Sequence, residues 1–170
     1  MRSHASRSSI DRSAATPQRL ESPGVRIPPP VFYILAFLTS LALQARFPLP
    51  FLSPALALGL GAALMAAGGL FIVLSILTLW RGHGTLNTNG SSAALVASGP
   101  YRISRNPMYL GLVLLYAGVA CVFSVVWALL ALTPLIIYTQ LSIIAREERY
   151  LDSAFGDAYR AYKARVRRWL

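Results

Sequence analysis

Two charged clusters in this 170-residue sequence could together bind a small zwitterion. The first lies in the segment SGPYRISRNPMYLG, residues 98–111, which contains Arg102 and Arg105. Asn106 is suited to cap a helix at this point, and Pro107 is suited to its first turn. Exposed N–H groups at a helix N-terminus, with arginines beside them, would hold a carboxylate or a phosphate. The alternative is that these arginines only mark a membrane boundary, and the residues alone leave both interpretations open.

The second cluster is the pair Glu147 and Glu148, which follows a long uncharged stretch. Carboxylates are unfavourable beside a helix C-terminus, and they have no role in setting membrane topology. A carboxylate pair that faces an arginine pair could bind both charged groups of an amino acid. The alternative is a local ion pair with Arg146 or Arg149.

The composition excludes several other kinds of site. Cys121 is the single cysteine, and His4 and His83 are the only histidines, so we expect neither an internal disulfide nor a metal site. The 16 Lys and Arg against 6 Asp and Glu could suggest nucleic-acid binding. We expect no nucleic-acid partner, because the sequence has no base-stacking motif and its basic residues flank the apolar stretches. Such a pattern indicates membrane topology and attraction to membrane lipids with anionic headgroups.

The elements that position these clusters are membrane spans, since 55% of the residues are hydrophobic and only 13% are charged. As one helix, the uncharged stretch at residues 108–145 would be about 57 Å long, nearly twice the hydrocarbon core of about 30 Å. It must therefore turn back, and we place the turn near Ser124. The sequence predicts an all-α integral membrane protein with about four transmembrane helices, at residues 31–47, 54–80, 107–123 and 125–145. In the second of these, small residues predict close helix packing rather than a ligand cleft, namely Gly59, Gly61, Gly68 and Gly69.

The charge distribution predicts the orientation of these spans. Fifteen of the 16 Lys and Arg fall on one side of the predicted membrane, and only Arg46 falls on the other. The positive-inside rule therefore predicts a multi-pass protein with both termini in the cytoplasm, in a bacterial inner membrane. Residues 1–30 are rich in Ser, Arg and Pro and predict a disordered basic tail, although an organellar transit peptide has a similar composition.

A C-terminal amphipathic helix is predicted at about residues 147–168. Its apolar side chains recur at three- and four-residue steps, and basic residues fill much of the remaining surface. The apolar series is Leu151, Phe155, Tyr159, Tyr162, Val166 and Trp169. Such a cytoplasmic helix could lie at the lipid headgroups or cover a binding site.

From about Gly84 to Leu170 the sequence resembles the isoprenylcysteine carboxyl methyltransferases and the related phospholipid methyltransferases of membranes. The resemblance is carried by GPYRISRNPMYLG, by the two spans behind it, and by REERYLDSAFGDAYRAYKARV. In that family the first segment and the glutamate pair bind S-adenosylmethionine at the cytoplasmic membrane face. Residues 31–170 would then be a membrane methyltransferase domain. The positions implied to bind the cofactor are Gly99, Pro100, Tyr101, Arg105, Asn106, Pro107, Tyr109, Gly111, Glu147 and Glu148.

One departure from the family is Asn106, where eukaryotic members typically have His. Asn can still donate and accept hydrogen bonds, but it cannot supply a titrating imidazole. The resemblance suggests Arg105 for the methionyl carboxylate and Glu148 for the amino group or the ribose. It also suggests Tyr101 and Tyr109 as pocket walls. Glu147 and Glu148 are the candidates for a catalytic role.

The implied reaction is an in-line displacement, in which a nucleophile attacks the methyl group on the sulfonium. Positioning and exclusion of water would provide most of the catalysis. Because a general base is hard to supply, we expect a lipophilic carboxylate or thiol as the acceptor. Two alternatives stay open, a membrane NAD(P)H-dependent sterol-reductase-like enzyme and a non-enzymatic membrane scaffold. The sequence predicts no oligomeric state.

Overall fold

The computed structural model describes residues 29–84 and 95–170. Most of the predicted basic tail, and residues 85–94 of the loop after the second predicted span, therefore lie outside the described residues. Within the described ranges every regular element is a helix. The elements are α1 (Pro29–Arg46), α2 (Pro54–Gly84), the 3₁₀ turn η1 (Gly99–Arg102), α3 (Pro107–Val122), α4 (Val126–Tyr138), the π-helical turn η2 (Thr139–Ile144) and α5 (Ala145–Arg165).

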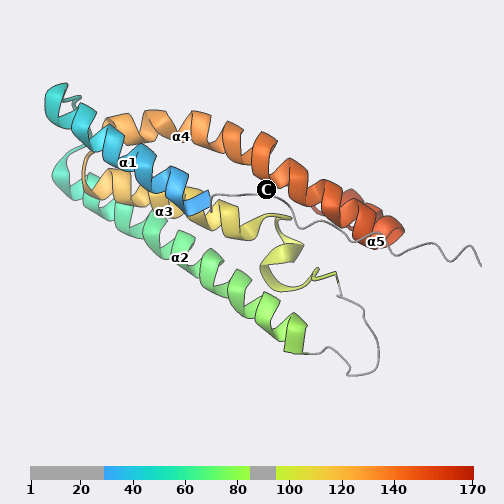
Figure 1. Ribbon diagram of the computed structural model, residues 1–170. Helices are drawn as coiled ribbons and strands as arrows, with labels where there is room; N and C mark the ends of the chain where they lie inside the picture. Colours follow the sequence, from blue (N-terminus) through green and yellow to red (C-terminus); the bar gives the residue numbers. More distant parts are fainter. Residues whose placement is uncertain (1–28, 85–94) are drawn as a thin grey trace, which may run out of the picture.

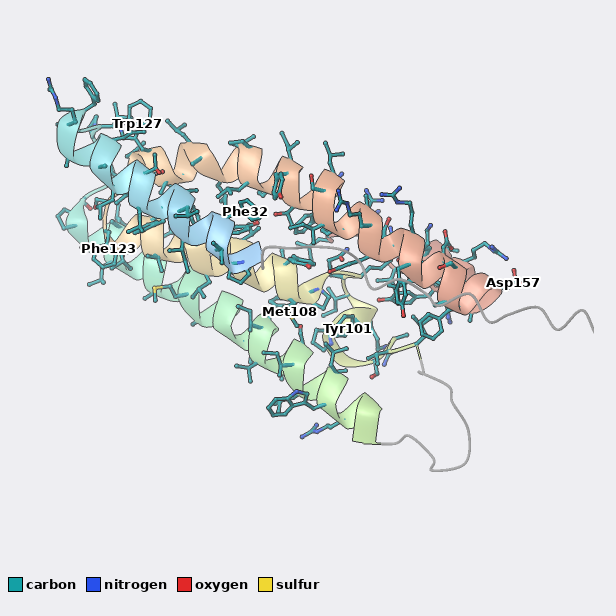
Figure 2. The ribbon with its side chains drawn as sticks, in the orientation of Figure 1. Phe32, Tyr101, Met108, Phe123, Trp127 and Asp157 are labelled. Atoms are coloured by element: carbon teal, nitrogen blue, oxygen red, sulfur yellow. The ribbon has the colours of Figure 1, made fainter. Side chains whose placement is uncertain are left out.

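The helices form an elongated bundle, in which α2 packs along α3 and α1 lies against α4 (Figure 1). Helix α5 continues from α4 and η2 almost in line (Figure 1). Phe123 and Trp127 mark the end where the α1–α2 and α3–α4 connections lie, and Tyr101 and Asp157 mark the other end (Figure 2). The helices therefore run back and forth between two ends of the molecule.

The chain reverses direction at Ser124, as the sequence predicts. Helix α3 ends at Val122 and α4 begins at Val126. Ser124 has a φ of 52°, an uncommon conformation for a residue other than glycine. The Val125 N–H donates to the Ala120 carbonyl at 2.9 Å and closes the turn. The long uncharged stretch is therefore two helices rather than one.

Two helices are long and apolar enough to cross a membrane, at Pro54–Arg81 and within the continuous helical segment Val126–Arg165. The other two apolar helices, Pro30–Arg46 and Pro107–Val122, are shorter. Large apolar side chains point away from the bundle on both long helices. Leu58 on α2 and Leu130 on α4 are 58% and 56% exposed. Such surfaces are typical of lipid-facing helices.

Helix α5 differs in two respects from the helix predicted at residues 147–168. It ends at Arg165, and Val166 is extended, with φ −122° and ψ 130°. Gly156 also interrupts it, with φ +50° and ψ −121°. Val166 and Trp169 therefore do not belong to its apolar face. The physical reason is that the last residues leave the helix to make hydrogen bonds with the loop before α3, described below.

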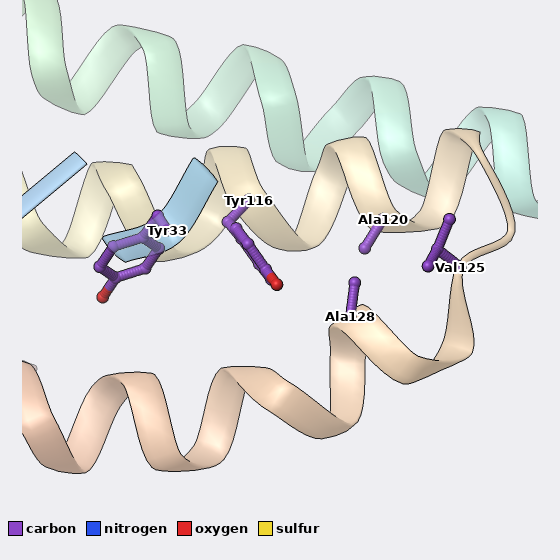
Figure 3. Close-up of a cluster of buried hydrophobic side chains, with 5 residues drawn as sticks. All are labelled: Tyr33, Tyr116, Ala120, Val125 and Ala128. Carbon is purple, nitrogen blue, oxygen red and sulfur yellow. The ribbon is translucent and has the colours of Figure 1, made fainter. Parts of the chain in front are cut away.

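The centre of the bundle is a small cluster of buried side chains from α1, α3 and α4. It consists of Tyr33, Tyr116, Ala120, Val125 and Ala128 (Figure 3). The Tyr33 hydroxyl is 3.1 Å from Oγ1 of the fully buried Thr139, so α1 is attached to η2 by a buried hydrogen bond. A buried hydroxyl without such a partner would be costly.

Glycines allow the closest contact in the bundle, between α2 and α3. A Cβ on Gly68 would lie 2.6 Å from the Gly111 carbonyl oxygen, and one on Gly118 would lie 2.8 Å from the Gly61 carbonyl oxygen. By contrast, a Cβ on Gly69 would meet nothing within 4 Å. The prediction of close packing is therefore confirmed for Gly61 and Gly68, which face α3.

Gly68→Ala should lower the midpoint of thermal unfolding of the purified protein in detergent, because the new methyl group forces the α2 and α3 backbones apart. Overpacking of this kind costs about 1–3 kcal/mol. Gly69→Ala is the matched control, and it should leave the midpoint unchanged or raise it, since Ala has the higher helix propensity. Equal midpoints for the two variants would contradict the proposed contact.

Candidate active site

A cavity of about 270 Å³ opens where the loop before α3 meets the start of α5, at the end of the bundle marked by Tyr101 (Figure 2). Its lining combines charged, aromatic and aliphatic side chains from both predicted clusters. The lining residues are Leu79, Leu95, Val96, Tyr101, Arg105, Asn106, Glu147, Glu148, Leu151, Phe155, Tyr159 and Tyr162. The structure therefore brings the first segment and the glutamate pair together, although they are far apart in the sequence.

The local fold of residues 98–106 brings Arg105 into the bundle. Gly99 has a φ of +57°, and a Cβ there would lie 2.8 Å from Oγ1 of Thr78 on α2. Glycine is thus required both by the backbone conformation and by the close approach of α2. Pro100 is buried, and its carbonyl accepts the N–H groups of Ile103 and Ser104. This tight turn directs the chain back toward α5.

Glu148 is the centre of an ion cluster and is only 8% exposed. Nε of Arg168 donates to its Oε1 at 3.0 Å, and Nη2 of Arg168 donates to its Oε2 at 2.6 Å. Nη1 of Arg105 lies 3.0 Å from the same Oε1. A buried carboxylate requires such partners, because an unpaired charge would lose its hydration without compensation. Glu148 thus pairs with Arg105 and Arg168. The alternative interpretation of the sequence expects a local ion pair with Arg146 or Arg149 instead.

Arg105 has hydrogen-bonding capacity that the described residues do not use. Its contact with Glu148 is an ion pair without good hydrogen-bond geometry. Nε and Nη1 are both buried, and neither donates to a described residue in hydrogen-bond geometry. Buried donors of this kind are rare in folded proteins, and a common explanation is a ligand or a water. The guanidinium could therefore hold an anion inside the cavity.

Glu147 has a different environment from its neighbour. The Tyr109 hydroxyl donates to its Oε1 at 2.6 Å. Burial raises the pKa of the Glu147 carboxyl, and the hydrogen bond from Tyr109 opposes part of this shift. Tyr109 does not itself line the cavity, and it acts on the cavity through Glu147.

Tyrosines form much of the remaining wall. The Tyr162 hydroxyl donates to the Tyr101 carbonyl at 2.6 Å and ties α5 to η1. Burial, with a smaller effect of Glu147, raises the pKa of Tyr101 to about 12. Burial, with a smaller effect of Glu148, also raises the pKa of Tyr159, and the charge of Arg105 and a hydrogen bond with it oppose part of this shift. These phenols therefore stay neutral at ordinary pH. Because α5 supplies much of the wall, it covers the cavity, which is one of the two roles predicted for this helix.

Asn106 is the N-cap residue of α3, but its side chain does not cap the helix. Nδ2 instead donates to the Arg168 carbonyl at 3.0 Å. Asn106 and Pro107 are buried beneath the C-terminal residues, which corrects the expectation of an exposed helix N-terminus. The returning chain covers this helix start, and its Arg168 carbonyl accepts the hydrogen bond from the Asn106 amide.

Gly111 lies at the α2–α3 contact, where a Cβ would be 2.7 Å from the Gly68 carbonyl oxygen, and it does not line the cavity. Arg102 is exposed, so the two arginines of the first segment have different surroundings.

Sequence reasoning missed Arg168. It belongs to a basic run with Arg165 and Arg167, and this pattern indicated lipid headgroups rather than an ion cluster.

Comparison with known proteins identifies the family. The model of the phospholipid methyltransferase family matches residues 56–158. Over 27 residues the chain is 74% identical to an uncharacterized protein of Haemophilus influenzae. That stretch is 16% of this chain, and the chain spans only 43% of the relative's length. No solved structure matches. Because the family match covers more than half of the sequence, the chain belongs to the phospholipid methyltransferase family.

Proposed function

We propose that this protein transfers a methyl group from S-adenosylmethionine to a lipophilic carboxylate or thiol acceptor at the cytoplasmic face of a membrane. The observation that carries the proposal is the buried guanidinium of Arg105, whose Nε and Nη1 have no hydrogen-bond partner among the described residues, in a cavity that two glutamates also line. Family membership favours methyl transfer over the reductase and scaffold alternatives.

The donor set of the cavity fits the polar groups of S-adenosylmethionine. Arg105 would hold the methionyl carboxylate through its unused N–H groups. Glu147 or Glu148 would accept hydrogen bonds from the ammonium group or the ribose. Leu95, Val96 and the tyrosine wall would contact the adenine. Gly99, Pro100 and Pro107 would contribute by shaping the loop that presents Arg105.

When bound, S-adenosylmethionine supplies a methyl group activated by its sulfonium. The chain's own residues would bind the two reactants in line and exclude water. Tyr159 and Tyr162 are buried, and they would close the cavity on the α5 side. No described side chain supplies an imidazole at the cavity. The side chain of His83 lies outside the part that the structure describes.

A second acceptor class is an aminophospholipid, and Glu147 favours it. An amine must lose a proton before or during methylation. A glutamate whose pKa is raised by burial is a better proton acceptor near neutral pH than an ordinary glutamate. Glu147 lines the cavity, so it is within the site where such a proton would be released.

We further propose that residues 31–170 form one membrane domain with four spans, near residues 31–47, 54–80, 107–123 and 125–145, in a bacterial inner membrane. The two short connections lie at the end opposite the cavity (Figure 2). At that end Nε1 of Trp127 donates to the Phe47 carbonyl at 2.8 Å. An indole in this position is typical of a membrane interface. The cavity and most described cations would then face the cytoplasm.

The topology is tested by cysteines introduced at Ser53 and Ser153, both exposed, in intact cells treated with a membrane-impermeant thiol reagent. The native Cys121 is 3% exposed and should not react. We expect labelling at position 53 and protection at position 153, because the charge asymmetry places the α5 end inside. Labelling at 153 with protection at 53 would invert the orientation and place the cavity away from the cytosol.

Cofactor binding is tested by Arg105→Ala, measured by calorimetric titration of the detergent-purified protein with S-adenosylmethionine. Truncating one partner of a buried charged contact costs roughly 2–5 kcal/mol, so affinity should fall by tens of fold or more. Arg149→Ala is the matched control, because Arg149 is exposed on α5 and its Nε donates to the Ala145 carbonyl. Similar small effects of both substitutions would mean that these arginines only set topology.

The acceptor is tested in membranes supplied with radiolabelled S-adenosylmethionine and matched prenylcysteine carboxylate, lipophilic thiol and aminophospholipid. We expect label on the carboxylate or the thiol. Exclusive labelling of the aminophospholipid would overturn this expectation and favour Glu147 as the base. In that case Tyr109→Phe should move the acidic limb of the pH profile to higher pH. Losing the hydrogen bond that lowers the Glu147 pKa leaves the carboxyl protonated over a wider range.

A further inference from the structure

The last residues of the chain fold back along the loop before α3. The Arg105 N–H donates to the Arg167 carbonyl at 2.9 Å. Ser104 Oγ and Asn106 Nδ2 donate to the Arg168 carbonyl at 3.1 and 3.0 Å. Nε1 of Trp169 donates to Oε1 of Gln140 at 2.8 Å. This C-terminal segment, residues 166–169, lies beyond the family match, which ends at residue 158.

The Arg168 side chain contacts the site through Glu148. Both of its hydrogen bonds to Glu148 use the planar fork of the guanidinium, at 3.0 and 2.6 Å. Arg168 is not among the residues that line the cavity, whereas Glu148 and Arg105 are. Its side chain is 35% exposed, against 10% for Glu148. Arg168 thus pairs with a glutamate of the cavity wall without lining the cavity itself.

The charges of the cluster explain what this arrangement achieves. The two arginines and the one carboxylate of the cluster together carry one net positive charge. The unused N–H donors that could meet an anion are on Arg105. Without Arg168, Glu148 would have Arg105 as its cationic partner in this cluster, and the pair would be neutral. A ligand carboxylate would then meet a guanidinium already compensated by a glutamate. In a partly buried site this loss of net charge weakens anion binding strongly.

We propose that Arg168 is a positioning residue of the cofactor site, which pairs with Glu148 so that Arg105 keeps unused N–H donors for the carboxylate of S-adenosylmethionine. This inference rests on the proposed function. It also changes the role of Glu148, which holds the arginines in place instead of contacting the ammonium group. Glu147 is then the carboxylate left for that contact.

The alternative is that Arg168 only attaches the C-terminal segment. The segment has other attachments that do not involve this side chain. The Arg168 carbonyl is held by Ser104 and Asn106, and Trp169 is held by Gln140. Removing the Arg168 side chain should therefore leave the segment in place and act mainly on the charge of the cluster.

The test is calorimetric titration of S-adenosylmethionine into the detergent-purified full chain. Substituting a residue that holds a binding residue in place typically costs roughly 10–100-fold in affinity, by analogy with residues behind metal ligands. We expect a loss of this size for Arg168→Ala and also for Arg168→Gln. Arg168→Lys keeps the charge without the fork and should lose less. Arg165→Ala, an exposed control on the same basic run, should bind like the unsubstituted protein.

The decisive variant is the double substitution Glu148→Gln with Arg168→Ala. It leaves Arg105 as the one charge of the cluster and restores the net positive charge, so it should recover most of the lost affinity. The midpoint of thermal unfolding of each variant shows that it is folded, and Arg168→Gln replaces Arg168→Ala if the latter is not. Unchanged affinity in the single variants, or no recovery in the double variant, would overturn the inference. Failure of the unsubstituted protein to bind would instead overturn the proposed function.

Discussion

The burial of Glu148 is the constraint on which the cavity end of the molecule depends. A carboxylate that is 8% exposed at the edge of an apolar bundle must have cations beside it, and the cations come from two other parts of the chain. Arg105 arrives from the loop before α3, and Arg168 arrives from the C-terminal segment. The loop must therefore turn at Gly99, and α5 must end at Arg165, for the three side chains to meet. The same convergence encloses the cavity.

The apolar part of the helix bundle serves the same end by holding two helices in register. Gly61, Gly68, Gly111 and Gly118 let α2 and α3 pack with their backbones in contact, and this fixes where the loop before α3 emerges. On the other side, η2 inserts a π-helical turn between α4 and α5. One extra residue rotates all that follows by about 100° relative to a continuous α-helix. This rotation helps to set which face of α5 presents the glutamates to the cavity.

The sequence predicted those features that follow from local rules. Charge and hydropathy located the apolar helices, and length alone required the reversal at Ser124. The meeting of Arg105 with the glutamates also followed, because both lie at the same predicted membrane face. The hydrogen-bond partners of Asn106 and Arg168 could not be predicted. Each depends on a hydrogen bond between residues that are distant in the sequence, 62 positions apart for Asn106 and Arg168 and 20 positions apart for Arg168 and Glu148. A run of arginines near a membrane has the same composition whether or not one member is an ion-pair partner.

The two adjacent glutamates show how the fold gives different properties to identical side chains. Helical spacing turns successive residues by about 100°, so Glu147 faces Tyr109 on α3 while Glu148 faces the arginines. Glu147 receives a hydrogen bond from the neutral Tyr109 hydroxyl on α3, and burial raises its pKa. Glu148 receives cations on both oxygens and is thereby occupied. Both oxygens of Glu148 are engaged by the arginines, so this carboxylate has little capacity left to bind an ammonium group. The proposed division of roles therefore gives the contact with the ammonium group to Glu147 and the pairing of the two arginines to Glu148.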